Sequence, residues 1–344
     1  MSGKAAERSM ALKSMPPILY GTAWKDTRTA DLVFTAFLQG FRGVDTAAQR
    51  KHYREDLVGK GVYQACAQLG LVRGDVWLQT KFTPVSGQDT TGYVPYDVQA
   101  PVAEQVCASF QASLANLHPE QTIPSVTELV AKYAVTARGN RDKVPSPPPA
   151  HAVYIDSYLL HSPMPTLQST LEAWRVLEAL VDTGLVRQIG LSNVYDPQIF
   201  QTLFQLARIK PSIVQNRWHS STGHDVSLLP LFSPQMSPNT FPPPAHTDVE
   251  APHGVTYQPF WTLSGNQRLL NSDTVALLAI KHSLTPAQVV YAFIHQGLGI
   301  PGLRTCVLSG TKNEAHMDEA MQAVSLDAWE EDDLTALRAE VYGE

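Results

Sequence analysis

Three ionisable side chains lie at the ends of short apolar segments, where a buried strand would normally avoid charge. They are Asp45, Lys81 and His161, which close the segments 41–47, 76–82 and 152–161. In a parallel α/β barrel the carboxyl ends of all strands meet on one face, and reactive groups lie there. Since three consecutive segments repeat the pattern, we interpret these residues as a site for acid–base chemistry rather than as separate structural ion pairs.

The elements that would position them alternate along the chain. Eight apolar segments rich in β-branched residues are predicted strands: 17–24, 41–47, 76–82, 152–161, 186–193, 212–217, 255–260 and 305–309. Helical periodicity is found at 29–38, 55–69, 98–117, 167–182, 197–207, 273–282, 286–296, 313–323 and 327–340. This alternation predicts an α/β fold with a parallel sheet, and eight strands predict closure into a (β/α)8 TIM barrel.

Two proline-rich segments interrupt the alternation. Residues 119–151 and 233–253 each contain six prolines, and both lie between a helix and the next strand. We interpret them as irregular insertions on the face opposite the three ionisable residues, and residues 1–16 as a polar N-terminal arm. The 344 residues are then expected to form one barrel, 1–344, rather than two domains.

Composition excludes several function classes. The net charge of −6 does not favour nucleic-acid binding, which needs a basic patch. We find no apolar stretch of about 18 residues, so no membrane span is expected. Cys66, Cys107 and Cys306 are odd in number and far apart, which fits neither a disulfide framework nor a metal site. We expect a cytoplasmic protein without metal, a monomer or weak oligomer.

The chain resembles the aldo-keto reductases in a series of motifs that occur in the order of that family. They are Gly21-Thr22-Ala23-Trp24, Gly43-Val44-Asp45-Thr46-Ala47, Tyr53 with Glu55, Val58-Gly59, Thr80-Lys81, Ile155-Asp156-Ser157-Tyr158-Leu159-Leu160-His161, Gly190-Leu191-Ser192-Asn193 and Gln215-Asn216. The similarity runs from about residue 18 to residue 324 outside the two insertions. The resemblance implies an NADPH-dependent oxidoreductase that reduces a small aldehyde or ketone to the alcohol.

The resemblance also implies a catalytic tetrad of Asp45, Tyr53, Lys81 and His161. Tyr53 follows Asp45 by eight residues, a longer spacing than is usual in the family, so the loop at 48–52 is interpreted as lengthened. Tyr53 is the only tyrosine in this loop. We expect it to be the general acid, with His52 as the alternative.

Carbonyl reduction explains why these residue types belong together. Negative charge develops on the carbonyl oxygen as hydride reaches the carbon, so a proton donor must meet that oxygen. A free phenol has a pKa of about 10, and a neighbouring lysine lowers it. Asp45 would keep Lys81 charged, Lys81 would lower the pKa of Tyr53, and a neutral His161 would donate a hydrogen bond to the carbonyl oxygen.

Hydride must come from a cofactor, because no side chain supplies it. No G-x-G-x-x-G motif follows the first strand, so a Rossmann site is not indicated. The resemblance implies a nicotinamide dinucleotide across the barrel rim, with its carboxamide held by Ser192, Asn193 and Gln215 and its ring stacked on Tyr257. The remaining residues of this part of the cofactor site are Gly21, Thr22, Gln258, Phe260 and Thr262.

The adenine end of the cofactor is expected after the last strand, at Gly310, Thr311 and Lys312. A helix N-terminus beside a lysine suits the 2′-phosphate of NADPH, so NADPH is preferred and NADH remains possible. In the helix that follows, His316 stands where the family commonly has an arginine, and Glu319 matches the family.

Trp24 and Trp218 are expected to line the substrate pocket. Two other functions remain open. The first is a nicotinamide-binding barrel with a regulatory or scaffold role and little catalysis. The second is a barrel enzyme of unrelated, metal-dependent chemistry, against which the sequence offers no His/Asp/Glu cluster at ligand spacing.

Overall fold

The computed structural model describes residues 14–139, 153–233 and 254–343. Its strands form one parallel sheet in the order β8-β7-β6-β5-β4-β3-β2-β1-β9. The strands are β1 (Ile18–Gly21), β2 (Gly43–Asp45), β3 (Trp77–Phe82), β4 (Ile155–Leu160), β5 (Val186–Ser192), β6 (Ile213–Arg217), β7 (Thr256–Phe260), β8 (Arg304–Thr305) and β9 (Val307–Ser309).

The sheet is closed through its last segment. β8 pairs with β7, and β9 pairs with β1 on the other side. Between them, the Cys306 N–H donates to the Tyr257 carbonyl oxygen at 3.0 Å. The predicted eighth strand is therefore present, but it is divided into two short pieces. The TIM-barrel prediction is confirmed, with nine strands in a nearly closed barrel.

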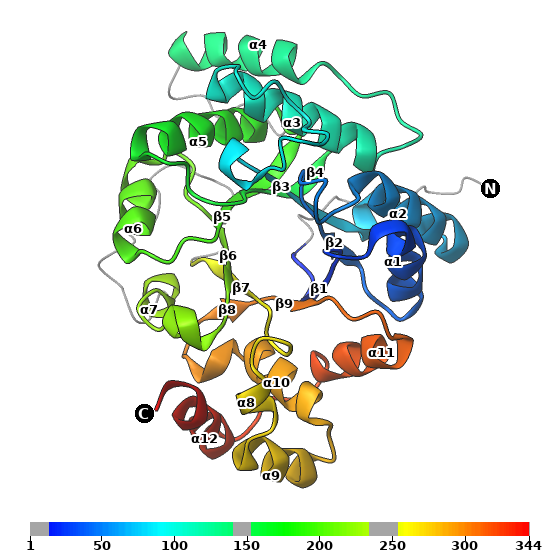
Figure 1. Cartoon of the computed structure of the whole chain (residues 1–344), viewed down its shortest axis with the longest axis vertical. Helices are drawn as coiled ribbons and strands as arrows, with labels where there is room; N and C mark the ends of the chain where they lie inside the picture. Colours follow the sequence, from blue (N-terminus) through cyan, green and yellow to red (C-terminus); the bar gives the residue numbers. More distant parts are fainter. Residues whose placement is uncertain (1–13, 140–152, 234–253, 344) are drawn as a thin grey trace, which may run out of the picture.

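Helices surround this ring of strands (Figure 1). They are α1 (Thr29–Leu38), α2 (Glu55–Leu69), α3 (Val102–Leu117), α4 (Val126–Gly139), α5 (Leu167–Asp182), α6 (Pro197–Leu206), α7 (Leu229–Phe232), α8 (Gln267–Leu270), α9 (Asp273–His282), α10 (Pro286–His295), α11 (Glu314–Ala323) and α12 (Glu331–Tyr342). Several begin at the caps that the sequence offers. The Thr166 and Thr285 side chains accept hydrogen bonds from the third backbone N–H of α5 and of α10.

The proline-rich insertions are not confirmed as irregular segments. The first of them contains the regular helix α4, on the outer side of α3 and α5 (Figure 1). Its remaining part, 140–152, lies outside the described residues, as do 234–253 of the second insertion and 1–13 of the N-terminal arm.

Side chains alternate between the barrel interior and the helix layer, as the period of a strand requires. In β3, Gln79 and Lys81 face the interior, where they bond to residues of other strands. The other face of each strand packs against the helices in one large apolar core. A smaller cluster of Leu19, Trp77, Cys306 and Leu308 fills the interior, with Met15 packed against it.

Within the described part of the chain, no single helix is long and apolar enough to cross a membrane. There, only α9 and α10 taken together have the length and composition of a membrane span, and the two helices are bent by 89° relative to each other. No group of three or more metal-ligating side chains occurs there either. The three cysteines are free thiols.

Candidate active site at the carboxyl ends of the strands

The centre of the site is a buried ion pair between β2 and β3. Lys81 is fully buried, and its Nζ donates to both carboxylate oxygens of Asp45, at 2.7 and 2.8 Å, and to the carbonyl oxygen of Thr46 at 2.8 Å. Burial lowers the pKa of Lys81, while the Asp45 carboxylate opposes that change. All three donors of the ammonium group are thus used by oxygen atoms.

Asp45 is held in turn by amide side chains in the barrel interior. Its Oδ1 accepts from Gln79 Nε2 at 2.8 Å and from Gln215 Nε2 at 3.1 Å. Both amides also donate to Gln258 Oε1, at 2.7 and 2.9 Å. Asp45 is 5 % exposed, so these bonds replace the water that a carboxylate would otherwise bind.

Tyr53 is half-buried above the lysine. Lys81 Nζ lies 5.5 Å from the centroid of its ring. Within the described residues the Tyr53 hydroxyl has no hydrogen bond, from Lys81 or from any other group. Burial, and secondarily the Asp45 carboxylate, raise the pKa of Tyr53. This differs from the expectation that Lys81 lowers that pKa, because the effect of burial is the largest and Lys81 donates to Asp45 and Thr46 instead.

His161 completes the group. Its ring is inclined at 68° to the Tyr53 ring, with the centroids 6.0 Å apart. Its Nδ1 lies 2.7 Å from the Thr83 hydroxyl. Burial, Lys81 and His52 lower the pKa of His161 to about 3, so the imidazole is neutral near pH 7. The structure therefore brings together all four side chains of the predicted tetrad.

Comparison with known proteins finds similarity to aldo-keto reductases. The Aldo/keto reductase family matches residues 150–228, which include β4, His161, β5 and β6. An NAD(P)H-dependent D-xylose reductase of Hypocrea jecorina is 26% identical over 288 residues, which are 82% of this chain and 78% of that protein. An uncharacterised oxidoreductase of Schizosaccharomyces pombe is 26% identical over 60% of this chain and 53% of its own length.

Solved structures agree in fold. An aldo-keto reductase from a Medee basin deep-sea metagenome library superimposes with a TM-score of 0.65 at 19% identity, covering 96% of this chain and 93% of the other. Residues 150–228 thus match the aldo-keto reductase family, and the solved structures share the barrel fold over almost the whole chain. A variant of Gox0644 in complex with NADPH has a TM-score of 0.59 at 23% identity, with 94% of this chain and 89% of the other covered.

The predicted carboxamide ligands lie next to His161 and Asp45. Asn193 Nδ2 donates to the His161 carbonyl oxygen at 2.8 Å, and Asn193 itself has a positive φ of 52°. Ser192 Oγ donates to the Gln215 carbonyl oxygen at 2.7 Å. Thr22, below them at the end of β1, donates to the Asp45 carbonyl oxygen through its hydroxyl at 2.9 Å.

Two predicted cofactor residues of β7 lie elsewhere. Tyr257 is fully buried in the helix layer, where its hydroxyl donates to Asp225 Oδ2 at 2.8 Å and its ring stacks on Phe232. Gln258 is fully buried inside the barrel. The structure therefore does not bring the Tyr257 ring or the Gln258 amide to the rim. The inward and partly exposed aromatic side chain of β7 is Phe260, which packs on the inner apolar cluster.

Thr262 and one of the two predicted pocket residues are buried, whereas the other pocket residue is exposed. Thr262 is 3 % exposed, close to the Tyr291 hydroxyl. Trp24 is 61 % exposed, and its ring lies 3.8 Å from the His52 ring. Trp218 is fully buried and packs on His224, so in this structure its side chain does not reach the surface.

The predicted adenine end contains a second lysine that the sequence analysis did not single out. Lys25, 5 % exposed, donates to the Gly310 carbonyl oxygen. Burial and the charge of Lys312 lower the pKa of Lys25 to about 8. Tyr20 donates to the Thr311 carbonyl oxygen at 2.8 Å and fixes the same segment. Lys25 directly follows Trp24 in the first motif, which is the signal that could have identified it.

Two residues of α11 complete this region. His316 is exposed, and the Glu319 carboxylate lies 3.5 Å from the Thr285 hydroxyl at the start of α10. Asn313 caps the N-terminus of α11, and its Oδ1 accepts from the Ala315 N–H at 2.9 Å.

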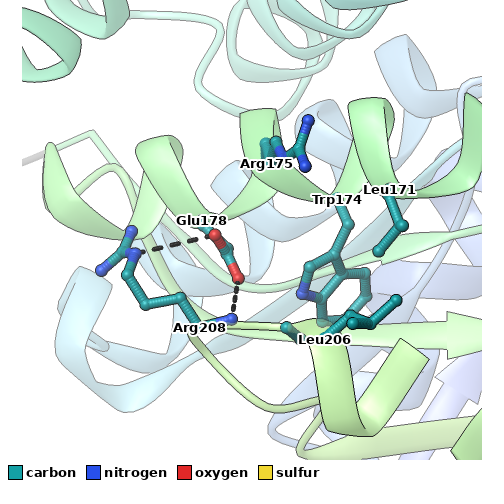
Figure 2. A pocket seen from close by; sticks show the side chains of 7 residues that line it. Leu171, Trp174, Arg175, Glu178, Leu206 and Arg208 are labelled. Carbon is teal, nitrogen blue, oxygen red and sulfur yellow. Dashed lines mark hydrogen bonds and ion pairs between the residues drawn. The ribbon is translucent and has the colours of Figure 1, made fainter. Parts of the chain in front are cut away.

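Two surface cavities of about 270 Å³ each lie in the helix layer rather than at the tetrad. One is formed by α5 and the end of α6, where Glu178 accepts from the Arg208 backbone and pairs with its guanidinium beside Trp174 (Figure 2). Glu178 and Arg208 bond to each other there, and none of the lining residues belongs to the tetrad.

Proposed function

We propose that this protein reduces an aldehyde or ketone to the alcohol with hydride from NADPH. The observation that supports the proposal best is the contact between the four side chains. Lys81 is bound by Asp45 and lies 5.5 Å from the centroid of the Tyr53 ring, and that ring is inclined at 68° to the ring of a neutral His161. A relative is named as an NAD(P)H-dependent reductase, and a structural neighbour contains NADPH.

Each of the four side chains has a distinct role in this proposal. Tyr53 keeps its proton, because burial raises its pKa, and it gives that proton to the carbonyl oxygen during reduction. Lys81 carries the positive charge that compensates the phenolate left behind. Asp45 holds that charge in place. His161, neutral, donates a hydrogen bond that orients the carbonyl oxygen.

The chain's own residues fit a phosphorylated dinucleotide. Lys25 and Lys312 place two positive charges at the start of α11, and among the described residues no carboxylate pairs with either. A phosphate between them would relieve their repulsion. Ser192 and Asn193 offer polar groups beside His161 for the carboxamide. When bound, NADPH would supply the hydride that no side chain provides.

The role of Tyr53 is tested by Tyr53→Phe, with Tyr63→Phe on the exposed side of α2 as the matched control. Loss of a general acid typically costs about 10²-fold or more in rate. We expect that loss in turnover of an activated aromatic aldehyde, with unchanged NADPH affinity in a fluorescence titration. Full activity of Tyr53→Phe would remove Tyr53 from the mechanism.

The cofactor preference is tested by Lys312→Ala, with the exposed Lys60→Ala as the control. If Lys312 binds the 2′-phosphate, the variant loses affinity for NADPH much more than for NADH. Equal losses for the two cofactors would show that the 2′-phosphate is not bound there.

The alternative, a nicotinamide-binding barrel without catalysis, has one observation in its favour. The Tyr53 hydroxyl lacks a hydrogen bond from Lys81, so the proton donor and its partner charge are not directly connected. NADPH binding without turnover of any aldehyde, ketone or quinone would support this alternative.

A further inference from the structure

Thr83 contacts the only imidazole of the predicted tetrad. It lies directly after β3, two residues beyond Lys81 and on the same side of the chain. Thr83 is 1 % exposed, and its Oγ1 is 2.7 Å from His161 Nδ1. On the other side of the ring, His161 Nε2 makes no hydrogen bond within the described part of the chain.

The direction of this hydrogen bond follows from the partners of the two groups. A neutral imidazole has one donor nitrogen and one acceptor nitrogen, whereas a hydroxyl has one hydrogen to donate. In the residues that the structure describes, Thr83 Oγ1 has no second partner. If Nδ1 donated, the buried Thr83 hydrogen would have no acceptor, which is unfavourable. The bond is satisfied when Thr83 donates to Nδ1 and His161 carries its hydrogen on Nε2.

The surroundings of Thr83 hold its hydroxyl in this orientation. A β-branched side chain has few χ1 rotamers, and a Cβ placed on Gly87 would be 2.9 Å from the Thr83 methyl group. The Thr83 carbonyl oxygen accepts from the Tyr96 hydroxyl at 2.6 Å. Gln49, in the lengthened loop, donates to the Gly87 carbonyl oxygen at 2.5 Å and ties that loop to the same turn.

We propose that Thr83 is a positioning residue that holds His161 in the Nε2–H tautomer, with Nε2 as the donor to the substrate's carbonyl oxygen. The first half concerns this chain's own hydrogen bonding and stands without a reaction. The second half rests on the proposed carbonyl reduction. Thr83 itself does not touch the substrate in this proposal.

The tautomer is measured directly by ¹⁵N–¹H correlation spectra of protein labelled with ¹⁵N-histidine, in which the two tautomers give different patterns. His161→Gln identifies the His161 signals among the 11 histidines. We expect Nε2–H in the wild type and in Thr83→Ser, and a mixture of tautomers in Thr83→Val. Nδ1–H in the wild type, or unchanged Nε2–H in Thr83→Val, would overturn the first half.

Kinetics test the second half. Deleting a donor to a developing oxyanion typically costs about 10²–10³ in kcat. Thr83→Val should lose kcat in proportion to the share of His161 that no longer carries hydrogen on Nε2, which is about twofold for an equal mixture of tautomers. Thr83→Ser should restore kcat, and NADPH affinity should not change in either variant. A tautomer mixture with wild-type kcat would refute the role of Nε2 while leaving the Tyr53→Phe result to decide the proposed function separately.

Discussion

Lys81, Tyr53 and His161 are set in protonation states that suit reduction. Lys81 is surrounded by Asp45 and a carbonyl oxygen, which favour its charged form against the effect of burial. Tyr53 has a raised pKa and therefore holds its proton near pH 7. His161 has a pKa of about 3 and is neutral. A donor phenol, a fixed positive charge and a neutral imidazole are the groups that a developing alkoxide requires.

Asp225 is a buried residue whose ionisation should change the free energy of unfolding. Burial raises its pKa to about 6, although the Tyr257 hydroxyl and Asn216 stabilise the carboxylate. An unfolded aspartate has a pKa of about 3.9, so the folded protein binds this proton more tightly. The stability contributed by Asp225 is therefore complete below pH of about 4 and is lost as the pH rises through about 6.

Asp225→Asn removes this ionisation and keeps an oxygen acceptor for Tyr257. We expect the melting temperature to fall less between about pH 5 and about pH 8 in the variant than in the wild type, because this range includes the ionisation of Asp225. Tyr257→Phe, which removes a hydrogen bond to the carboxylate, is expected to steepen that fall. An Asp225→Asn protein with the wild-type pH dependence would contradict the assignment.

Among the elements, the strands and most helices could be predicted because their periodicity is local. α4 is not expected from the sequence because six prolines make 119–151 resemble an irregular segment, whereas the 14 residues of the helix contain none. Gln111 Oε1 and Ser125 Oγ accept from the N–H groups of Val126 and Glu128, and these bonds cap the N-terminus of α4. The division of the last strand at Cys306 depends on pairing with β7 and β1, which no local pattern contains.

The sequence also predicts part of the candidate site. Asp45, Lys81 and His161 follow from their position at strand ends, and Tyr53 from the family resemblance. The structure directs the Tyr257 and Gln258 side chains to opposite faces of β7, because successive residues of a strand alternate between the two faces. Residue type alone does not decide which of the two reaches the barrel interior. Thr83 could have been found from its spacing of two residues after Lys81.

Close helix packing beside the lengthened loop depends on glycines in α2. A Cβ on Gly59 would lie 2.0 Å from the Asn116 carbonyl oxygen of α3, and one on Gly61 would lie 2.6 Å from the Ala30 carbonyl oxygen of α1. Both obstacles are backbone atoms, which cannot rotate away. α2 also begins two residues after Tyr53, so a shift of this helix would move the candidate general acid.

Gly59→Ala is expected to lower the free energy of unfolding by about 3 kcal/mol, since a backbone atom must be displaced. Gly74→Ala is the matched control, because a Cβ there meets nothing within 4 Å. Urea denaturation of both variants measures the difference. If Gly59→Ala and Gly74→Ala unfold at the same urea concentration, α2 and α3 are not as close as the structure places them.

Across the whole molecule, two buried carboxylates occupy opposite ends of the barrel. Asp45 lies at the carboxyl end of β2, within the tetrad. Asp156 lies at the start of β4, where it pairs with Arg73 at 2.6 Å and Arg187 at 3.3 Å. Both guanidinium groups also lie over the Tyr154 ring, at 3.8 and 4.1 Å. In TIM barrels the carboxyl face carries the chemistry and the opposite face contributes stability.

Because the two carboxylates lie at opposite ends of the barrel, replacing each aspartate by asparagine should have different effects on stability and activity. Asp156→Asn removes the negative charge shared by two arginines and should lower the free energy of unfolding by about 3 kcal/mol. Its kcat and KM, measured where the variant is folded, should remain those of the wild type. Asp45→Asn should lose activity in the folded state, because Lys81 loses the charge that holds it. A loss of kcat in folded Asp156→Asn would show that the two ends of the barrel are coupled.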